Sequence, residues 1–155
     1  MIPVPLARIA QNADGSAIKA LLVAAGPFDE TLPFDDIHPY WIVAELGGRI
    51  VGCIQTCPSR PVGHLEMLAV ASSLTAREHA AVIRVLFAAG ITCLHLNRSY
   101  MAAGFIPFEL KAYKRWLKKR GATVADSGNM MMWRLDMDTA TDHPYKEKSA
   151  NGVAA

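Results

Sequence analysis

Hydrophobic residues near the start of the chain follow two different periods. Residues 4–9 alternate weakly between apolar and polar positions, which predicts a strand. Residues 13–25 place apolar side chains at the i, i+3, i+4 and i+7 positions of a helix. The residues on that face are Ile18, Leu21, Leu22 and Ala25. Gly26 and Pro27 come next, as is typical after the end of a helix.

Two apolar segments rich in β-formers, residues 41–46 and 49–56, are separated only by Gly47 and Gly48. A two-residue glycine connection is typical of the tight turn of a β-hairpin. The pattern therefore predicts two antiparallel strands. Residues 63–70 are apolar and predict a third, buried strand.

A second helix is predicted over residues 75–89, where apolar positions again recur at a helical period and Gly90 follows as a stop signal. Residues 91–96 are then expected to form a strand. Because a strand, a helix and a strand follow one another, this last strand is expected to pair in parallel with the strand that ends at Val70.

The segment 107–121 begins with proline, ends with glycine and is a basic amphipathic helix by its pattern. Its apolar positions are Leu110, Tyr113, Trp116 and Leu117, and its bases are Lys111, Lys114, Arg115, Lys118, Lys119 and Arg120. We expect its apolar side to pack on the sheet; binding of a phosphate-bearing partner by its bases is the alternative. Residues 129–135 predict a final strand. Residues 136–155 are polar, so the domain is expected to span 1–135 and to end in a tail.

The chain has 155 residues, 52% of them hydrophobic and 19% charged, which is typical of one domain with a substantial core. The longest uncharged apolar run, 85–94, is about half of the ~20 residues that a membrane-spanning helix needs, so no membrane partner is expected. The first residues lack the pattern of a secretory signal, which favours a cytoplasmic protein. Cys53 and Cys57 are expected to be core thiols, and no spacing predicts a metal site.

The net charge of +2 conceals an asymmetry along the chain. Residues 28–45 carry five acids and no Lys or Arg, whereas residues 98–134 carry eight bases and two acids. Charged residues on a solvated surface can produce this asymmetry. The alternative is that the acidic segment binds a cationic partner and the basic segment a phosphate-bearing one. The sequence pI near 8.5 is too low to favour nucleic acid as a partner.

Three segments in a fixed order resemble the GNAT superfamily of acetyl-CoA-dependent N-acetyltransferases. Residues 42–52 resemble its second and third strands, residues 63–70 resemble its central fourth strand, and Tyr100-Met-Ala-Ala-Gly-Phe105 has its Tyr-x-x-x-Gly-Phe form. The resemblance spans residues 42–105. It implies an α/β fold with a mixed, mostly antiparallel sheet, a splayed parallel strand pair and flanking helices.

The resemblance also implies roles for individual residues. Glu66 is the implied base, with His64 relaying the proton from the same face of the strand, and Tyr100 is the implied acid for the leaving thiolate. Leu68 matches the position whose amide holds the thioester carbonyl, and Val70 the position that binds the pantetheine arm. Structural roles stay open: His64 as a core histidine, Glu66 as an ion-pair partner of Arg60 or Arg98, and Tyr100 as a packing residue.

The segment after the fourth strand departs from the family pattern. The implied coenzyme-binding residues are Thr75, Ala76 and Arg77, at a helix N-terminus suited to a diphosphate. Ala76 and Glu78 stand where the family has glycines, which allow close approach of the backbone to phosphate. We therefore expect acetyl-CoA to bind more weakly than in a member with the glycines.

The leading hypothesis is a GNAT-like N-acetyltransferase that transfers an acetyl group from acetyl-CoA to an amine on a small molecule or a protein. The acidic segment 29–36 would attract a cationic acceptor. The alternative is a GNAT-fold protein with reduced catalysis that is a binding or structural component of a homo-oligomer or larger assembly, such as a phage virion.

Overall fold

The computed structural model describes residues 4–26, 40–105, 111–124 and 130–134. Their elements, in chain order, are β1 Leu6–Ile9, the 3-10 turn η1 Asn12–Asp14, α1 Gly15–Ala25, β2 Trp41–Leu46, β3 Arg49–Cys57, β4 Val62–Val70, α2 Ala76–Leu96, β5 Met101–Phe105, α3 Lys111–Lys118, β6 Thr123–Val124 and β7 Met130–Arg134.

Within these residues seven strands form one sheet in the order β1-β2-β3-β4-β5-β7-β6. Every neighbouring pair is antiparallel except β4 and β5, which run in parallel. The predicted strands at 4–9, 41–46, 49–56, 63–70 and 129–135 are confirmed, as is the hairpin, whose Gly47 and Gly48 have φ of 59° and 76°. The mixed sheet with one parallel pair confirms the fold class inferred from the sequence.

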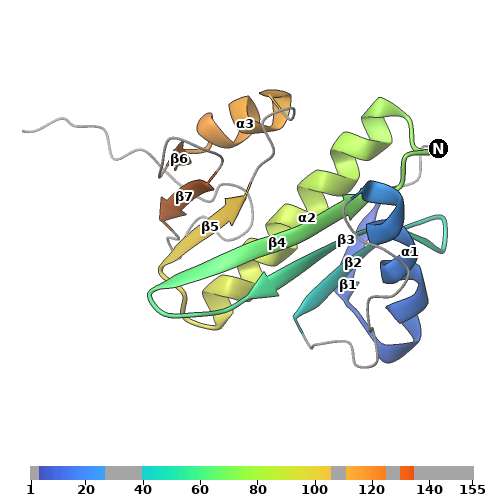
Figure 1. Cartoon of the computed structure of the whole chain (residues 1–155), viewed down its shortest axis with the longest axis horizontal. Coiled ribbons are helices and arrows are strands. Elements are labelled where there is room, and N and C mark those ends of the chain that lie inside the picture. Colours follow the sequence, from blue (N-terminus) through green and yellow to red (C-terminus); the bar gives the residue numbers. More distant parts are fainter. Residues whose placement is uncertain (1–3, 27–39, 106–110, 125–129, 135–155) are drawn as a thin grey trace, which may run out of the picture.

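Helices cover the two faces of this sheet (Figure 1). The face under α2 holds the larger apolar cluster, which includes Ile54, Leu65 and Leu86. The face under α1 holds a second cluster, which includes Ile18, Val43 and Cys53. Alternate residues of β2 and β3 belong to the two clusters, because successive side chains of a strand point to opposite faces of the sheet.

The prediction that Gly90 ends the helix and that residues 91–96 form a strand is wrong. The helix continues to Leu96, and the buried residues follow one helical face: they are Val82, Leu86, Phe87, Gly90, Ile91 and Leu94. A Cβ on Gly90 would lie 2.8 Å from Leu65 Cδ2, so this glycine lets α2 approach β4. The parallel partner of β4 is β5, in the segment 100–105.

At 21 residues α2 is long and apolar enough to cross a membrane by length and composition. One apolar face of α2 is instead buried against the sheet, as in a core helix of a globular domain.

The carboxy-terminal part of the chain adds α3 and the strands β5, β7 and β6, which form one end of the sheet. The helix predicted over 107–121 is confirmed in the residues that the structure describes, where it is α3. The turn after α3 ends at Gly121, whose φ is 82°. Residues 107–110 and the predicted tail 136–155 lie outside the described residues. Leu117 and Ala122 are buried in the α2-side cluster, so α3 packs its apolar side inward as expected.

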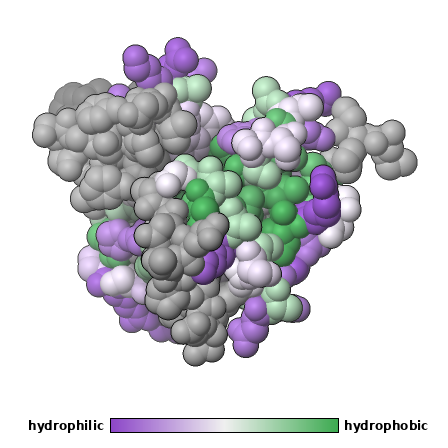
Figure 2. Space-filling view, turned by 45° about the vertical axis from the view of Figure 1, so that its right-hand side comes forward, coloured by the Kyte–Doolittle hydropathy of each residue, from purple (hydrophilic) through white to green (hydrophobic). Residues whose placement is uncertain are grey.

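The opposite edge of the sheet exposes apolar side chains. In β1, Leu6 and Ile9 are exposed, as is the preceding Val4. Figure 2 brings the side of the molecule with α1 forward and shows hydrophobic side chains gathered on it. A different contact fixes β1: the Arg8 guanidinium donates hydrogen bonds to both Asp14 and Glu45, joining β1, η1 and β2.

Candidate active site

The parallel strands β4 and β5 separate part-way along their length. They pair from Val62 with Met101 to Leu65 with Gly104. β4 then continues to Val70, while β5 ends at Phe105. Among the described strands, none pairs with that edge of β4 after Leu65. The sheet therefore opens next to the second half of β4.

Glu66, the implied base, lies at the start of this opening. It is exposed and faces the α1 side of the sheet, because Leu65 before it faces α2. His64 is half-buried on the same face, directly opposite Cys57 of β3. The prediction that His64 and Glu66 share a face of the strand is confirmed.

No ion pair or hydrogen bond joins Glu66 or His64 to another side chain in the described parts of the chain. The ion pair of Glu66 with Arg60 or Arg98 that was considered from the sequence is not formed among these residues. His64 is half-buried, so it is not a core histidine. Cys57 is only half-buried, unlike the buried Cys53. Burial, and then the negative charge of Glu66, raises the pKa of the Cys57 thiol. Cys57 is therefore a neutral thiol beside the Glu66 carboxylate.

A β-bulge follows Glu66, and after it the alternation of β4 side chains between the two faces of the sheet is shifted by one residue. Met67 has φ of 50°, and the register between β3 and β4 shifts here. After the bulge Ala69 belongs to the α1-side cluster, while Leu68 and Val70 pack on the α2 side. A β-bulge places an extra residue in one strand and so redirects the side chains that follow.

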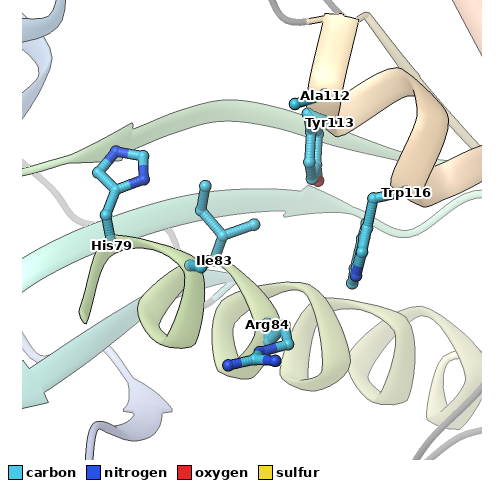
Figure 3. Close-up of a pocket in the computed structure, with 7 residues that line it drawn as sticks. His79, Ile83, Arg84, Ala112, Tyr113 and Trp116 are labelled. Carbon is cyan, nitrogen blue, oxygen red and sulfur yellow. The ribbon is translucent and has the colours of Figure 1, made fainter. Parts of the chain in front are cut away.

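An apolar groove of about 410 Å³ lies between α2 and α3 (Figure 3). Its lining residues are His79, Ala80, Ile83, Arg84, Ala112, Tyr113 and Trp116. Figure 3 shows Tyr113 and Trp116 pointing from α3 toward α2, with Ile83 facing them. Their rings stack at 5.5 Å between centroids, and each meets Phe87 edge to face. The volume is within the range of small-molecule sites.

The groove lies on the α2 side of the sheet, the side to which Leu68 and Val70 of β4 turn after the bulge. Tyr113 and Trp116 pack on the same α2-side cluster as Leu68 and Val70 of β4. Burial raises the pKa of Tyr113, so its phenol stays protonated and can donate a hydrogen bond. From the sequence, Tyr113 and Trp116 are assigned only to packing on the sheet. The signal that could have predicted a groove is their i, i+3 spacing in one helix together with the apolar face of the other helix.

The amino terminus of α2 is closed by its own side chains. Thr75 is the N-cap, and its Oγ1 accepts a hydrogen bond from the Glu78 backbone N–H at 3.3 Å. The Glu78 carboxylate in turn accepts from the Thr75 N–H at 2.9 Å and from its hydroxyl at 2.7 Å. A carboxylate therefore lies where a diphosphate would approach, while Ala76 and Arg77 are exposed beside it.

Tyr100 is not brought to the other predicted residues. Its backbone N–H donates to the Pro61 carbonyl at 3.0 Å, at the closed end of the strand pair. Glu66 follows Pro61 by five residues along the chain, which is about 16 Å at the usual rise of a strand. The Tyr100 side chain is 60% exposed, so it is not a packing residue either. In the Tyr-x-x-x-Gly-Phe segment, Tyr100 directly precedes β5, which begins at Met101.

No protein-family model matches the chain. No curated protein matches it either. Solved structures, in contrast, match most of the chain. The ribosomal-protein-S18-alanine N-acetyltransferase from Escherichia coli superposes with a TM-score of 0.70 at 13% identity, over 86% of this chain and 95% of the other.

Two further structures agree. Ard1 from Thermoplasma volcanium gives a TM-score of 0.66 at 16% identity, over 84% of this chain and 97% of that one. Diaminobutyrate acetyltransferase EctA from Paenibacillus lautus, solved with its substrate and coenzyme A, gives 0.61 at 16% identity, over 83% and 92%. The chain has the GNAT N-acetyltransferase fold. The match extends over nearly the whole length of each of the three neighbours.

Proposed function

We propose that this GNAT-fold protein is an N-acetyltransferase that transfers an acetyl group from acetyl-CoA to an amine. One observation carries the proposal: β4 separates from β5 after Leu65, with Glu66 on the α1 side of the sheet at that point and an apolar groove on the α2 side. A thioester arm from one side and an amine from the other can meet at such an opening.

On the amine side, Glu66 acts as the general base. The acceptor ammonium must lose a proton before its nitrogen attacks the thioester carbonyl. An exposed carboxylate that has no ion-pair partner among the described residues can take that proton directly or through water. His64 lies on the same face and is the candidate relay. The acids in 29–36 would attract a cationic acceptor, on a small molecule or a protein.

On the thioester side, the groove takes the pantetheine arm and the backbone of β4 holds the carbonyl. Val70 packs on the same side of the sheet as the groove, and the Leu68 amide follows the bulge on the stretch of β4 that β5 does not pair. The neutral phenol of Tyr113 is the candidate proton donor to the leaving thiolate, in place of Tyr100.

The test is acetyl-CoA binding by calorimetry together with a thiol-release assay against a panel of amines. Loss of a general base costs about 10²–10⁴-fold in rate, so Glu66→Gln is expected to lower kcat/KM by at least about 100-fold with coenzyme binding unchanged. Tyr113→Phe is expected to lower kcat, whereas the matched change Tyr100→Phe leaves it unaltered.

Turnover that survives Glu66→Gln would remove Glu66 from the mechanism. No acetyl-CoA binding at millimolar concentration would contradict the proposed activity as a whole.

A second function is favoured by the self-capped amino terminus of α2. A GNAT-fold protein whose phosphate-binding terminus carries a carboxylate can have lost turnover and serve as a binding component of an oligomer or a larger assembly. Acetyl-CoA binding with no thiol release for any amine would support this alternative over the enzyme.

A further inference from the structure

The outer edge of β1 has no partner strand among the described residues. β1 is the first strand of the sheet and pairs only with β2 (Figure 1). The Ala10 N–H donates to the Trp41 carbonyl at 2.8 Å, and in an antiparallel pair such bonds recur at every second residue. Alternate residues of β1 therefore bond to β2, and the backbone groups of Ala7 and Ile9 point away from the sheet.

The two outward residues differ in what they can still bind. Within the described parts of the chain, no hydrogen bond is formed by the N–H of Ala7 or Ile9, nor by the Ala7 carbonyl. The Ile9 carbonyl already accepts a hydrogen bond from the Arg8 guanidinium at 3.2 Å. Ala7 can therefore both donate and accept, whereas Ile9 has mainly a donor to offer.

These free groups match a second copy of the same edge. If an antiparallel pair has its two-fold axis at Ala7, the two copies of Ala7 exchange both of their hydrogen bonds. An axis at Arg8 would instead need the occupied Ile9 carbonyl as an acceptor and would place Arg8 opposite Arg8. Like charges directly opposite destabilise a strand pair, so the edge favours the axis at Ala7.

The side chains of this edge are apolar and exposed on both faces of the strand. Val4 is 75% exposed, Leu6 70% and Ile9 63%. Ile9 lies on the α2 side with Ala7, and Leu6 lies on the α1 side, so a strand added here would cover both. With the axis at Ala7, the Leu6 side chains of the two copies are diagonal neighbours, within reach of each other.

The basic side chain of β1 is matched within its own chain. Arg8 forms ion pairs with Asp14 and Glu45, each at 2.6 Å. It therefore presents no unmatched cation to a strand that approaches the edge. An apolar edge of this kind is complementary to itself, which favours a second copy over a charged peptide as its occupant.

We propose that two copies of the chain pair through β1 about a two-fold axis at Ala7, so that one continuous sheet crosses the dimer. The inference does not rest on the proposed function, since Glu66 belongs to β4, which β2 and β3 separate from β1. β1 has only 4 residues, so the contact is expected to be small beside the roughly 1,200–2,000 Å² of stable interfaces and to depend on concentration.

Sedimentation velocity of the full-length protein, from micromolar to millimolar concentration, measures the equilibrium. The wild type is expected to change from monomer to dimer over this range. Ala7→Pro removes an outward donor without touching the bonds to β2, because proline is tolerated where an edge N–H faces solvent. Leu6→Lys removes an apolar contact. Each variant is expected to raise the dissociation constant by about tenfold or more, because a two-fold interface carries the change twice.

The matched control is Val124→Lys, which adds the same charge at an exposed apolar residue of β6, the other edge strand of the sheet. It is expected to dimerise as the wild type does. Melting temperatures near that of the wild type show that the variants are folded.

Amide hydrogen exchange in dilute and concentrated samples tests the strand pairing itself. The Ala7 N–H is expected to exchange about tenfold more slowly in the dimer, because it is hydrogen-bonded there. A wild type that stays monomeric at millimolar concentration would overturn the proposal and leave the edge to an extended segment of another protein. A dimer that Leu6→Lys and Ala7→Pro both retain, or one in which the Ala7 N–H gains no protection, would overturn it too, because the copies then meet through another surface.

Discussion

At the amino terminus of α2, the Glu78 carboxylate accepts hydrogen bonds from both the N–H and the hydroxyl of Thr75. This reciprocal capping box satisfies donors that a helix start otherwise leaves free. These hydrogen bonds lower the pKa of Glu78. Glu78 thus stabilises the start of the helix, and its carboxylate would oppose a diphosphate at the place where the resemblance to GNAT proteins implies one.

Thr75→Ala is expected to lower the free energy of unfolding by about 1 kcal/mol at neutral pH, because the N-cap is lost. Urea unfolding measures this, with Ser73→Ala in the exposed loop before it as the control. Because the pKa of Glu78 is lowered in the fold, its contribution is present above its unfolded pKa and is lost as pH falls through the folded value. The difference between Thr75→Ala and wild type should therefore shrink at acid pH; an equal difference at both pH values would contradict the role of Glu78.

At the scale of elements, β4 and α2 approach each other through glycines. A Cβ on Gly63 would lie 2.7 Å from both Leu94 Cδ2 and Ser99 Oγ. The Ser99 hydroxyl is buried and donates to the Ser59 carbonyl at 2.8 Å, so it has little freedom to move. This contact fixes the start of β4 against the end of α2.

Gly63→Ala is expected to destabilise the protein by about 1–3 kcal/mol, the usual cost of overpacking a core. Denaturant unfolding measures the change. Ala20→Ser, on the exposed side of α1, is the control and should stay within about 0.5 kcal/mol of wild type. A Gly63→Ala protein as stable as the control would show that the β4–α2 contact relaxes freely.

At the scale of the whole molecule, the two reactants of the proposed reaction reach β4 from opposite faces. Glu66 and His64 face the α1 side, and the groove lies on the α2 side. Along the sequence, acids precede β2 and bases lie in and around α3. Such a separation of charge favours a cationic acceptor and an anionic coenzyme.

If the acids in 29–36 attract the acceptor, raising the ionic strength is expected to lower kcat/KM severalfold for a cationic amine, because salt screens exposed charges beyond about 10 Å. An uncharged acceptor analogue of similar size, at the same coenzyme concentration, is the control. Equal salt dependence for the two acceptors would show that the acidic segment does not select the acceptor by charge.

The sequence by itself determined the features that depend on neighbouring residues. The hairpin followed from Gly47 and Gly48 between two β-rich segments, and the shared face of His64 and Glu66 from the period of a strand. Together with the resemblance to GNAT proteins, these local patterns were enough for the fold class.

Tertiary structure decided what depends on contacts between distant residues. Gly90 has the appearance of a stop signal, but it is buried against Leu65, so the helix continues. The pairing of β4 with β5 placed Tyr100 at the closed end, and the packing of α3 on α2 brought Tyr113 and Trp116 to a groove. A sequence pattern reports the period of one element, whereas these sites arise where separate elements meet, and only packing sets that meeting.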